Sequence, residues 1–130
     1  MSGPLATPLF GIHEAALGLQ SRRLELISAN IANADTPGYR RKLTSFEPDR
    51  RDVPGAVTTG PVRLDRTELP QVYDPSHPLA DASGYYNGSN VDLIVEIADA
   101  RQAQRSYEAN MRVFDQVRQM SSSLNDLLRR

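Results

Sequence analysis

The stretch from Asn90 to Arg130 constrains the fold most, because about forty successive residues contain neither proline nor glycine. Apolar residues recur along it at steps of three and four, which is the spacing of one helix face. They form two stripes roughly 110° apart at ~100° per residue, a wider apolar sector than the seam of a two-stranded coiled coil. The pattern predicts a helix over 90–130 with neighbours on more than one side. The first stripe holds Leu93, Ile97, Ala100, Gln104, Tyr107, Met111 and Phe114, and the second holds Val91, Val95, Ala98, Ala109, Val113, Val117, Met120, Leu124 and Leu127.

Charged side chains fill the remaining positions of this stretch, among them Glu96 and Asp99. The glycine and asparagines just before it mark the start of the helix, with Ser89 or Asn90 as the expected N-cap. A helix of this length would measure about 60 Å, which exceeds a compact domain of this size. We therefore expect an elongated subunit or a helix that packs against other chains.

A second periodic segment covers 9–35 and follows a tail over 1–8 that we expect to be disordered. Its apolar residues repeat every seven positions in two series on opposite flanks of a helix. Gly11 and Gly18 each lower helicity by about 1 kcal/mol relative to alanine, so this helix should depend on assembly. The residues expected to pack are Leu17, Leu19, Leu24, Leu26 and Ile31 in this helix, and Tyr107, Met111, Phe114, Val117, Met120 and Leu124 in the C-terminal one.

The central segment, 36–89, is not helical in pattern, because prolines and glycines interrupt every periodic run. Short β-branched or alternating runs at 57–59, 62–65 and 71–73 predict two or three strands. The charged residues of 40–52 have the pattern of a solvated loop. Residues 73–86 read as a fixed loop, held extended by its prolines, that leads into the long helix.

Composition excludes several classes of function. The formal net charge is −1, which argues against a nucleic-acid binder. The chain has no cysteine, so disulfides and thiolate metal sites are impossible. Neither a membrane-spanning apolar run nor a Sec-type leader is expected from the sequence.

The sequence predicts no catalytic, metal or cofactor site. Neither of the two histidines has a partner at metal-ligand spacing, and no phosphate-binding loop or nucleophile elbow occurs. Asp74 and Asp81 flank His77, which would permit acid/base chemistry. Asp-Pro and His-Pro are more often loop residues, so we favour a structural loop.

Two blocks of sequence carry the functional signal. The first is a helix end followed by Pro37 and Gly38, which from spacing alone is a terminating turn. The first block comprises Asn30, Ile31, Ala32, Asn33, Ala34, Asp35, Thr36, Pro37, Gly38 and Tyr39. The second comprises Tyr73, Asp74, Pro75, His77, Pro78, Asp81, Gly84, Tyr85 and Asn90, followed by Val91, Asp92, Glu96 and the run from Arg105 to Asn110. Together the blocks resemble the bacterial flagellar rod, hook and hook-associated proteins, and the second resembles the proximal-rod members.

This resemblance implies a mainly α fold in which long N- and C-terminal helices pack as a coiled-coil-like antiparallel pair, with a short proline-rich, partly β hairpin between them. It implies a structural subunit of the proximal rod, in the periplasm-spanning part of the basal body. Such a subunit forms a helical tube that transmits torque from the rotor to the distal rod and hook. The implied partners are other rod proteins, the adaptor between rod and MS ring, the MS ring, further copies of the chain, and the flagellar type III export apparatus in transit. No nucleic acid or small-molecule substrate is implied.

Two other hypotheses remain from the residues alone. The apolar stripes would also suit a soluble helical adaptor that binds one partner helix in a groove. An enzyme built around His77 is the weakest of the three.

Overall fold

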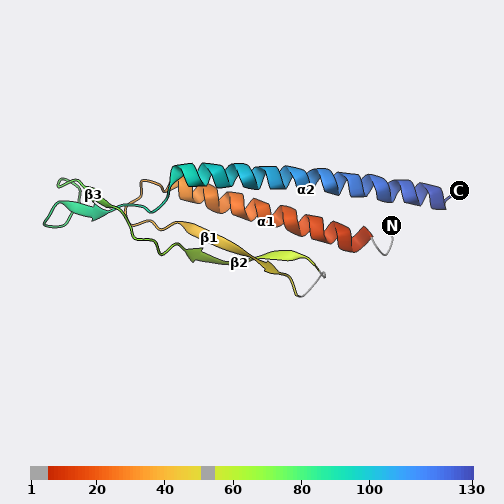
Figure 1. The fold of residues 1–130 in the computed structure, drawn as a ribbon, viewed down its shortest axis with the longest axis horizontal. Coiled ribbons are helices and arrows are strands. Elements are labelled where there is room, and N and C mark those ends of the chain that lie inside the picture. The colour runs from red at the N-terminus through yellow and green to blue at the C-terminus, as the bar shows by residue number, and fades with distance from the viewer. Residues whose placement is uncertain (1–5, 51–54) are drawn as a thin grey trace.

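The computed structural model describes residues 6–50 and 55–130 and is mainly helical, with a small antiparallel strand region at its centre, as predicted. Two long helices lie side by side and run in opposite directions, and the strands occupy one side and one end of the molecule (Figure 1). Within the described residues, neither helix has a stretch apolar and long enough to span a bilayer. The elements are α1 (Ala6–Ala32), β1 (Lys42–Pro48), β2 (Val57–Leu64), β3 (Gln71–Tyr73), β4 (Tyr85–Asn87) and α2 (Leu93–Leu128).

Helix α1 begins at Ala6, three residues before the expected 9, and ends at Ala32. Pro8 does not prevent this start, because amide groups in the first turn have no partner within a helix. The prediction of a disordered tail over 1–8 is therefore wrong for residues 6–8, which are helical. The rest of the predicted tail, 1–5, lies outside the described residues. At the other end, the Ala29 carbonyl accepts from both the backbone amide of Asn33 at 3.2 Å and its side-chain amide at 2.8 Å, which secures the last turn.

Helix α2 begins one turn later than the sequence suggested. Asp92 is the N-cap, and its carboxylate accepts from the amides of Ile94 at 2.9 Å and Val95 at 3.4 Å. The expected cap at Ser89 or Asn90 is therefore wrong. An aspartate at this position also matches the positive end of the helix macrodipole.

The core lies along the contact between α1 and the first half of α2. Leu19, Leu26 and Ile27 of α1 are buried, as is Ala103 of α2. Towards the N-terminal end of α1, the rings of Phe10 and Phe114 meet edge to face with centroids 5.3 Å apart. Beyond that contact α2 continues past the end of α1 (Figure 1).

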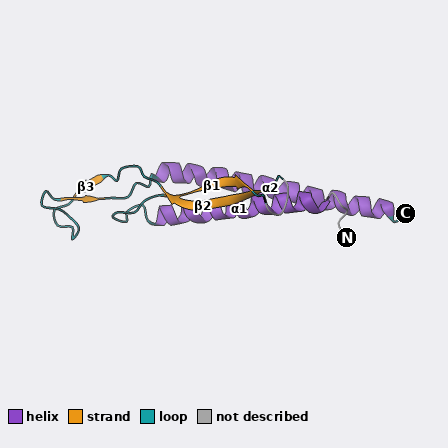
Figure 2. Cartoon of the chain, turned by 90° about the horizontal axis from the view of Figure 1, so that it is seen from below, coloured by secondary structure: helices purple, strands orange, loops and turns teal. Residues whose placement is uncertain are grey.

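Strands β1 and β2 form an antiparallel hairpin that packs against α1, with a register shift between Thr44 and Phe46 (Figure 2). Strands β3 and β4 form a second, three-residue pair at the far end of the molecule. The runs predicted at 57–59 and 62–65 fall on the single strand β2, and that at 71–73 on β3. Strands β1 and β4 correct the expectation of loops at 40–52 and 73–86.

The residues expected to pack divide into two groups. The predicted packing residues of α1 are more buried than those of α2, and α2 leaves much of its apolar surface exposed. Leu19 and Leu26 are buried, and Leu17, Leu24, Tyr107, Phe114 and Val117 are half-buried. Ile31, Met111, Met120 and Leu124 are exposed.

Truncating Leu26 to alanine should lower the free energy of unfolding by about 2–5 kcal/mol, because it leaves a cavity between α1 and α2. The matched control is Leu124→Ala, since Leu124 is 59% exposed; it should change the free energy by less than about 0.5 kcal/mol. Urea unfolding of the isolated chain, followed by circular dichroism, measures both. Equal losses would contradict this core.

Candidate functional site: the junction of α1, β1 and α2

Asn30, at the end of α1, is 1% exposed and fully hydrogen-bonded. Its side chain pairs with the backbone of Lys42 as a strand would: Nδ2 donates to the carbonyl at 3.0 Å, and Oδ1 accepts from the amide at 2.9 Å. Nδ2 also donates to Glu96 Oε1 at 3.4 Å. This one side chain therefore fixes the start of β1 against α1 and links both to α2.

Arg41 and Glu96 form the ionic centre of the junction. Arg41 Nε donates to Glu96 Oε1, and a guanidinium nitrogen reaches Asp99 Oδ2 at 2.7 Å. Glu96 is completely buried, and its Oε2 has no partner among the described residues. Because removing a carboxylate from water is costly unless it is paired, Arg41 is required for Glu96 to be accommodated. Arg23 of α1 approaches the other Asp99 oxygen at 3.7 Å.

The expectation that the basic residues of 40–42 belong to a solvated loop is therefore wrong for Arg41. Periodicity treated Glu96 and Asp99 as polar positions, yet they form the part of α2 that faces α1 and β1. The sequence did contain one indication of this contact. Glu96 and Asp99 are three residues apart and therefore share a helix face, and the adjacent Arg40 and Arg41 could supply a cation to it.

Tyr39 closes one side of the junction, since its hydroxyl donates to Asn30 Oδ1 at 3.1 Å. Burial raises the pKa of this hydroxyl, and the nearby negative charge of Glu96 raises it further. The phenol is therefore neutral at physiological pH and remains a donor.

Asn90 joins three segments that are distant in sequence. Its Oδ1 accepts from the Arg41 amide at 2.6 Å, and its Nδ2 donates to the carbonyls of Asp65 and Thr67, both at 3.2 Å. Hydrogen bonds from the hydroxyl and amide of Thr67 lower the pKa of Asp65, and the charges of Arg41 and Arg40 lower it further. An asparagine here holds the end of β2 beside the approach to α2.

The predicted block over 30–39 thus has two faces. Asn30 and Tyr39 point into the junction, and Gly38, at a φ of 73°, makes the turn that a side chain would strain. Asn33 Oδ1 accepts from the Thr36 hydroxyl at 3.1 Å. Pro37 is half-buried, whereas Ile31, Ala32, Thr36 and Gly38 are exposed.

The first part of the second predicted block, residues 74–84, forms the loop between β3 and β4, and its polar side chains bond to the loop itself. Asp74 Oδ1 accepts from the hydroxyl of Ser76 at 2.6 Å and from its amide, which lowers the pKa of Asp74. His77 Nδ1 accepts from the Leu79 amide at 3.1 Å, and its ring stacks on Tyr86 with centroids 4.0 Å apart. The described residues contain no group of three acidic or histidine side chains placed to hold a metal ion.

Gly84, the last residue of this loop, has a φ of 85°, and a side chain there would meet the Tyr73 ring at 2.9 Å. The rings of Tyr73 and Tyr85 pack against each other with centroids 5.0 Å apart. Pro75 and Pro78 are exposed, and Asp81 Oδ1 accepts from the Tyr85 amide at 3.1 Å. The loop is therefore ordered by its own contacts.

Two family models match the segments that build the junction. The model described as flagella basal body rod protein covers residues 10–40, and the model described as flagellar basal body rod FlgEFG protein C-terminal covers residues 82–127. The flagellar basal-body rod protein FlgC of Agrobacterium fabrum is 41% identical over 124 residues, which are 88% of this chain and 89% of the relative. The chain belongs to the FlgC family of flagellar basal-body rod proteins. FlgC of Salmonella typhimurium is 38% identical over 122 residues, 86% of this chain and 90% of that protein.

FlgC proteins are structural components of the flagellar basal body and not enzymes, which removes the hypothesis of a catalytic His77. The rod-family model ends just before Arg41, and the C-terminal model includes Glu96 and Asp99. The junction therefore joins the two regions by which the chain matches rod proteins.

Replacing Arg41 with methionine should lower the free energy of unfolding by about 3–5 kcal/mol, because Glu96 would be left charged and buried. The double variant Arg41→Met/Glu96→Met should recover part of this loss, since two apolar side chains need no partner. Urea unfolding measures both variants.

The control is Arg22→Met, because Arg22 pairs with Glu25 at 2.8 Å on the exposed side of α1. Its loss should cost no more than about 1 kcal/mol. An Arg41→Met variant as stable as Arg22→Met would show that the junction contributes little.

Proposed function

We propose that this chain is a subunit of the proximal rod, in which copies and other rod proteins assemble into a helical tube that transmits torque from the rotor to the distal rod and hook. The observation that carries the proposal is the apolar surface that α2 leaves uncovered. Ile94 is 80% exposed, and Met120 and Leu124 are each 59% exposed. Such side chains on several sides of one helix are expected where a helix is surrounded by neighbouring subunits.

The arrangement of the helices supports a coiled-coil-like pair within the inner layer of such a tube. Leu19, Leu26 and Phe114 would belong to the seam within one subunit, and Met111, Met120 and Leu124 to contacts between subunits. We infer that the adaptor between rod and MS ring, and the MS ring itself, contact one end of this assembly.

Torque requires that a subunit does not deform when its neighbours push on it. The junction supplies this, because Asn30, Arg41 and Glu96 connect three elements with hydrogen bonds and an ion pair. Directional polar contacts of this kind fix register more strictly than apolar contacts do.

The small core suits passage through the flagellar type III export apparatus, which we propose as the route to the rod. Among the described residues, the buried apolar side chains are Leu19, Leu26, Ile27, Ala56 and Ala103. A subunit with so little buried apolar surface should unfold at low cost before transport. Its helices would gain stability when neighbours cover α2.

Washed basal bodies from the source bacterium should retain this chain, as mass spectrometry of the rod fraction would detect, and a deletion strain should be non-motile. A chain that stays soluble and absent from the particle would overturn the proposal and favour a helical adaptor with one partner helix.

A sharper form of this test uses Met120→Glu, which places a charge on the uncovered surface of α2. The isolated variant should unfold like the natural chain, because Met120 contributes little to the subunit core. It should be lost from the rod fraction, since a charge buried between subunits is costly. The control Ser122→Glu adds the same charge at an exposed polar position on the opposite side of α2 and should be retained.

A further inference from the structure

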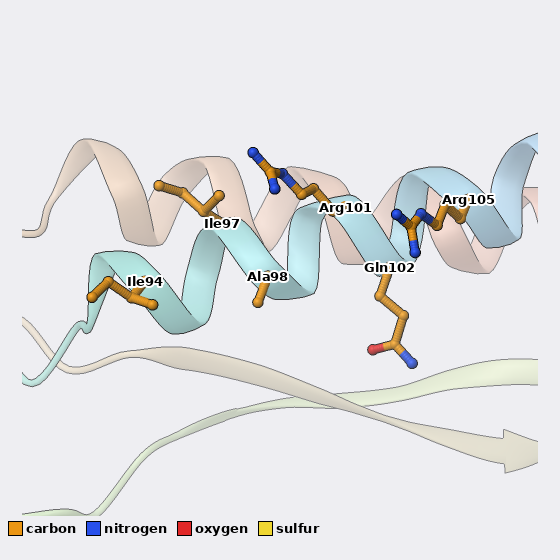
Figure 3. A pocket seen from close by; sticks show the side chains of 6 residues that line it. All are labelled: Ile94, Ile97, Ala98, Arg101, Gln102 and Arg105. Carbon is orange, nitrogen blue, oxygen red and sulfur yellow. The ribbon is translucent and has the colours of Figure 1, made fainter.

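A shallow recess lies on the first half of α2, beside the ionic junction, where Gln102 at its edge accepts a hydrogen bond from Arg23 at 3.1 Å. Two rows of side chains at helical spacing of four border it: Ile94, Ala98 and Gln102 in one row, and Ile97, Arg101 and Arg105 in the other (Figure 3). It has a volume of about 540 Å³, and the small side chain of Ala98 leaves room between the larger ones. No part of the described chain fills it.

The recess is apolar at one end and positively charged at the other. Ile94 is 80% and Ile97 is 47% exposed, so both leave much of their apolar surface uncovered within the subunit. Neither Arg101 nor Arg105 forms an ion pair with any described residue. An occupant should therefore combine apolar side chains with carboxylates.

The loop between β3 and β4 has this combination at its surface. Leu79 and Tyr73 are each 64% exposed, and Asp74 and Asp81 lie in the same loop. Each aspartate uses Oδ1 for hydrogen bonds within the loop, whereas its Oδ2 accepts none from the described residues. No lysine or arginine occurs between residues 67 and 100, so within this segment only His77 offsets the charge of Asp74.

The loop also has the position and rigidity of a docking element. It projects beyond the two-helix layer, at the end of the molecule where α2 begins (Figures 1 and 2). Its internal hydrogen bonds and the stacking of His77 on Tyr86 hold it in one shape, so docking would cost little conformational entropy.

We propose that the β3–β4 loop of one copy docks into the α2 recess of a second copy of this chain. Leu79 lies over Ala98, against Ile94 and Ile97. The free carboxylate oxygens of Asp74 and Asp81 pair with Arg101 and Arg105. Because two different surfaces meet, the contact is heterologous and repeats from copy to copy, as an open helical assembly requires. This proposal rests on the proposed function and specifies one contact within it.

The test places a photo-crosslinking benzophenone amino acid at Leu79 and irradiates basal bodies that contain the variant. The expected product is a covalent dimer of this chain, in which mass spectrometry joins position 79 to a peptide within 94–105. The same group at Ile94, which is 80% exposed, should give the reciprocal product at residues 73–85. A crosslinker at Val62, on β2 and 41% exposed, is the matched control and should not label 94–105.

An adduct of position 79 with another protein, or with another surface of this chain, would overturn the proposal. So would the absence of any adduct in particles that retain the variant. The charge-reversed recess, Arg101→Glu/Arg105→Glu, should reduce the yield from position 79 at least tenfold, whereas Arg112→Glu/Arg118→Glu should not. Absence of the natural chain from the particles would instead reject the proposed function.

Discussion

The fold depends on the ion pair between Arg41 and the buried Glu96. A fully buried carboxylate is tolerated only when a cation and hydrogen bonds compensate for its lost hydration. Here the cation comes from the segment after α1, and Asn30 adds a donor from α1 itself. The three elements can therefore meet in only one register, because shifting any of them would leave Glu96 charged, buried and unpaired. Asn90 then adds the approach to α2 and the end of β2 to the same centre.

This centre explains why so much apolar surface remains free. The part of α2 that faces α1 carries Glu96, Asp99 and Ala103 at its beginning, so little of its apolar surface is used inside the subunit. The exposed apolar side chains lie on other sides of the same helix. The helix itself continues past the end of α1 (Figure 1). A stable monomer usually has an apolar interior and a polar surface, whereas here the junction inside the subunit is polar and the surface of α2 is apolar. This arrangement suits a subunit that gains stability when it binds its neighbours.

Sequence periodicity predicted both long helices, because their apolar spacing extends over many turns and no proline occurs beyond the first turn of either helix. It missed β1 and β4, since short strands rich in charged or turn residues give no clear alternation. It also assigned Glu96 to the polar side of α2, because a pattern of residue types cannot reveal a cation brought from position 41 by the fold. The block around Asn30 was found by resemblance, yet its pairing with the backbone of Lys42 required the structure.

The central claim is that the ionic junction is stably folded in the isolated chain, whereas the C-terminal part of α2 becomes stable only when neighbouring subunits cover it. Hydrogen exchange of the isolated chain tests this claim most directly. The amides of Arg41 and Lys42, bonded to Asn90 at 2.6 Å and to Asn30 at 2.9 Å, should exchange slowly. Amides of residues 119–128, past the contact of Phe10 with Phe114, should exchange rapidly. Protection at 119–128 equal to or above that at Arg41 and Lys42 would contradict the account.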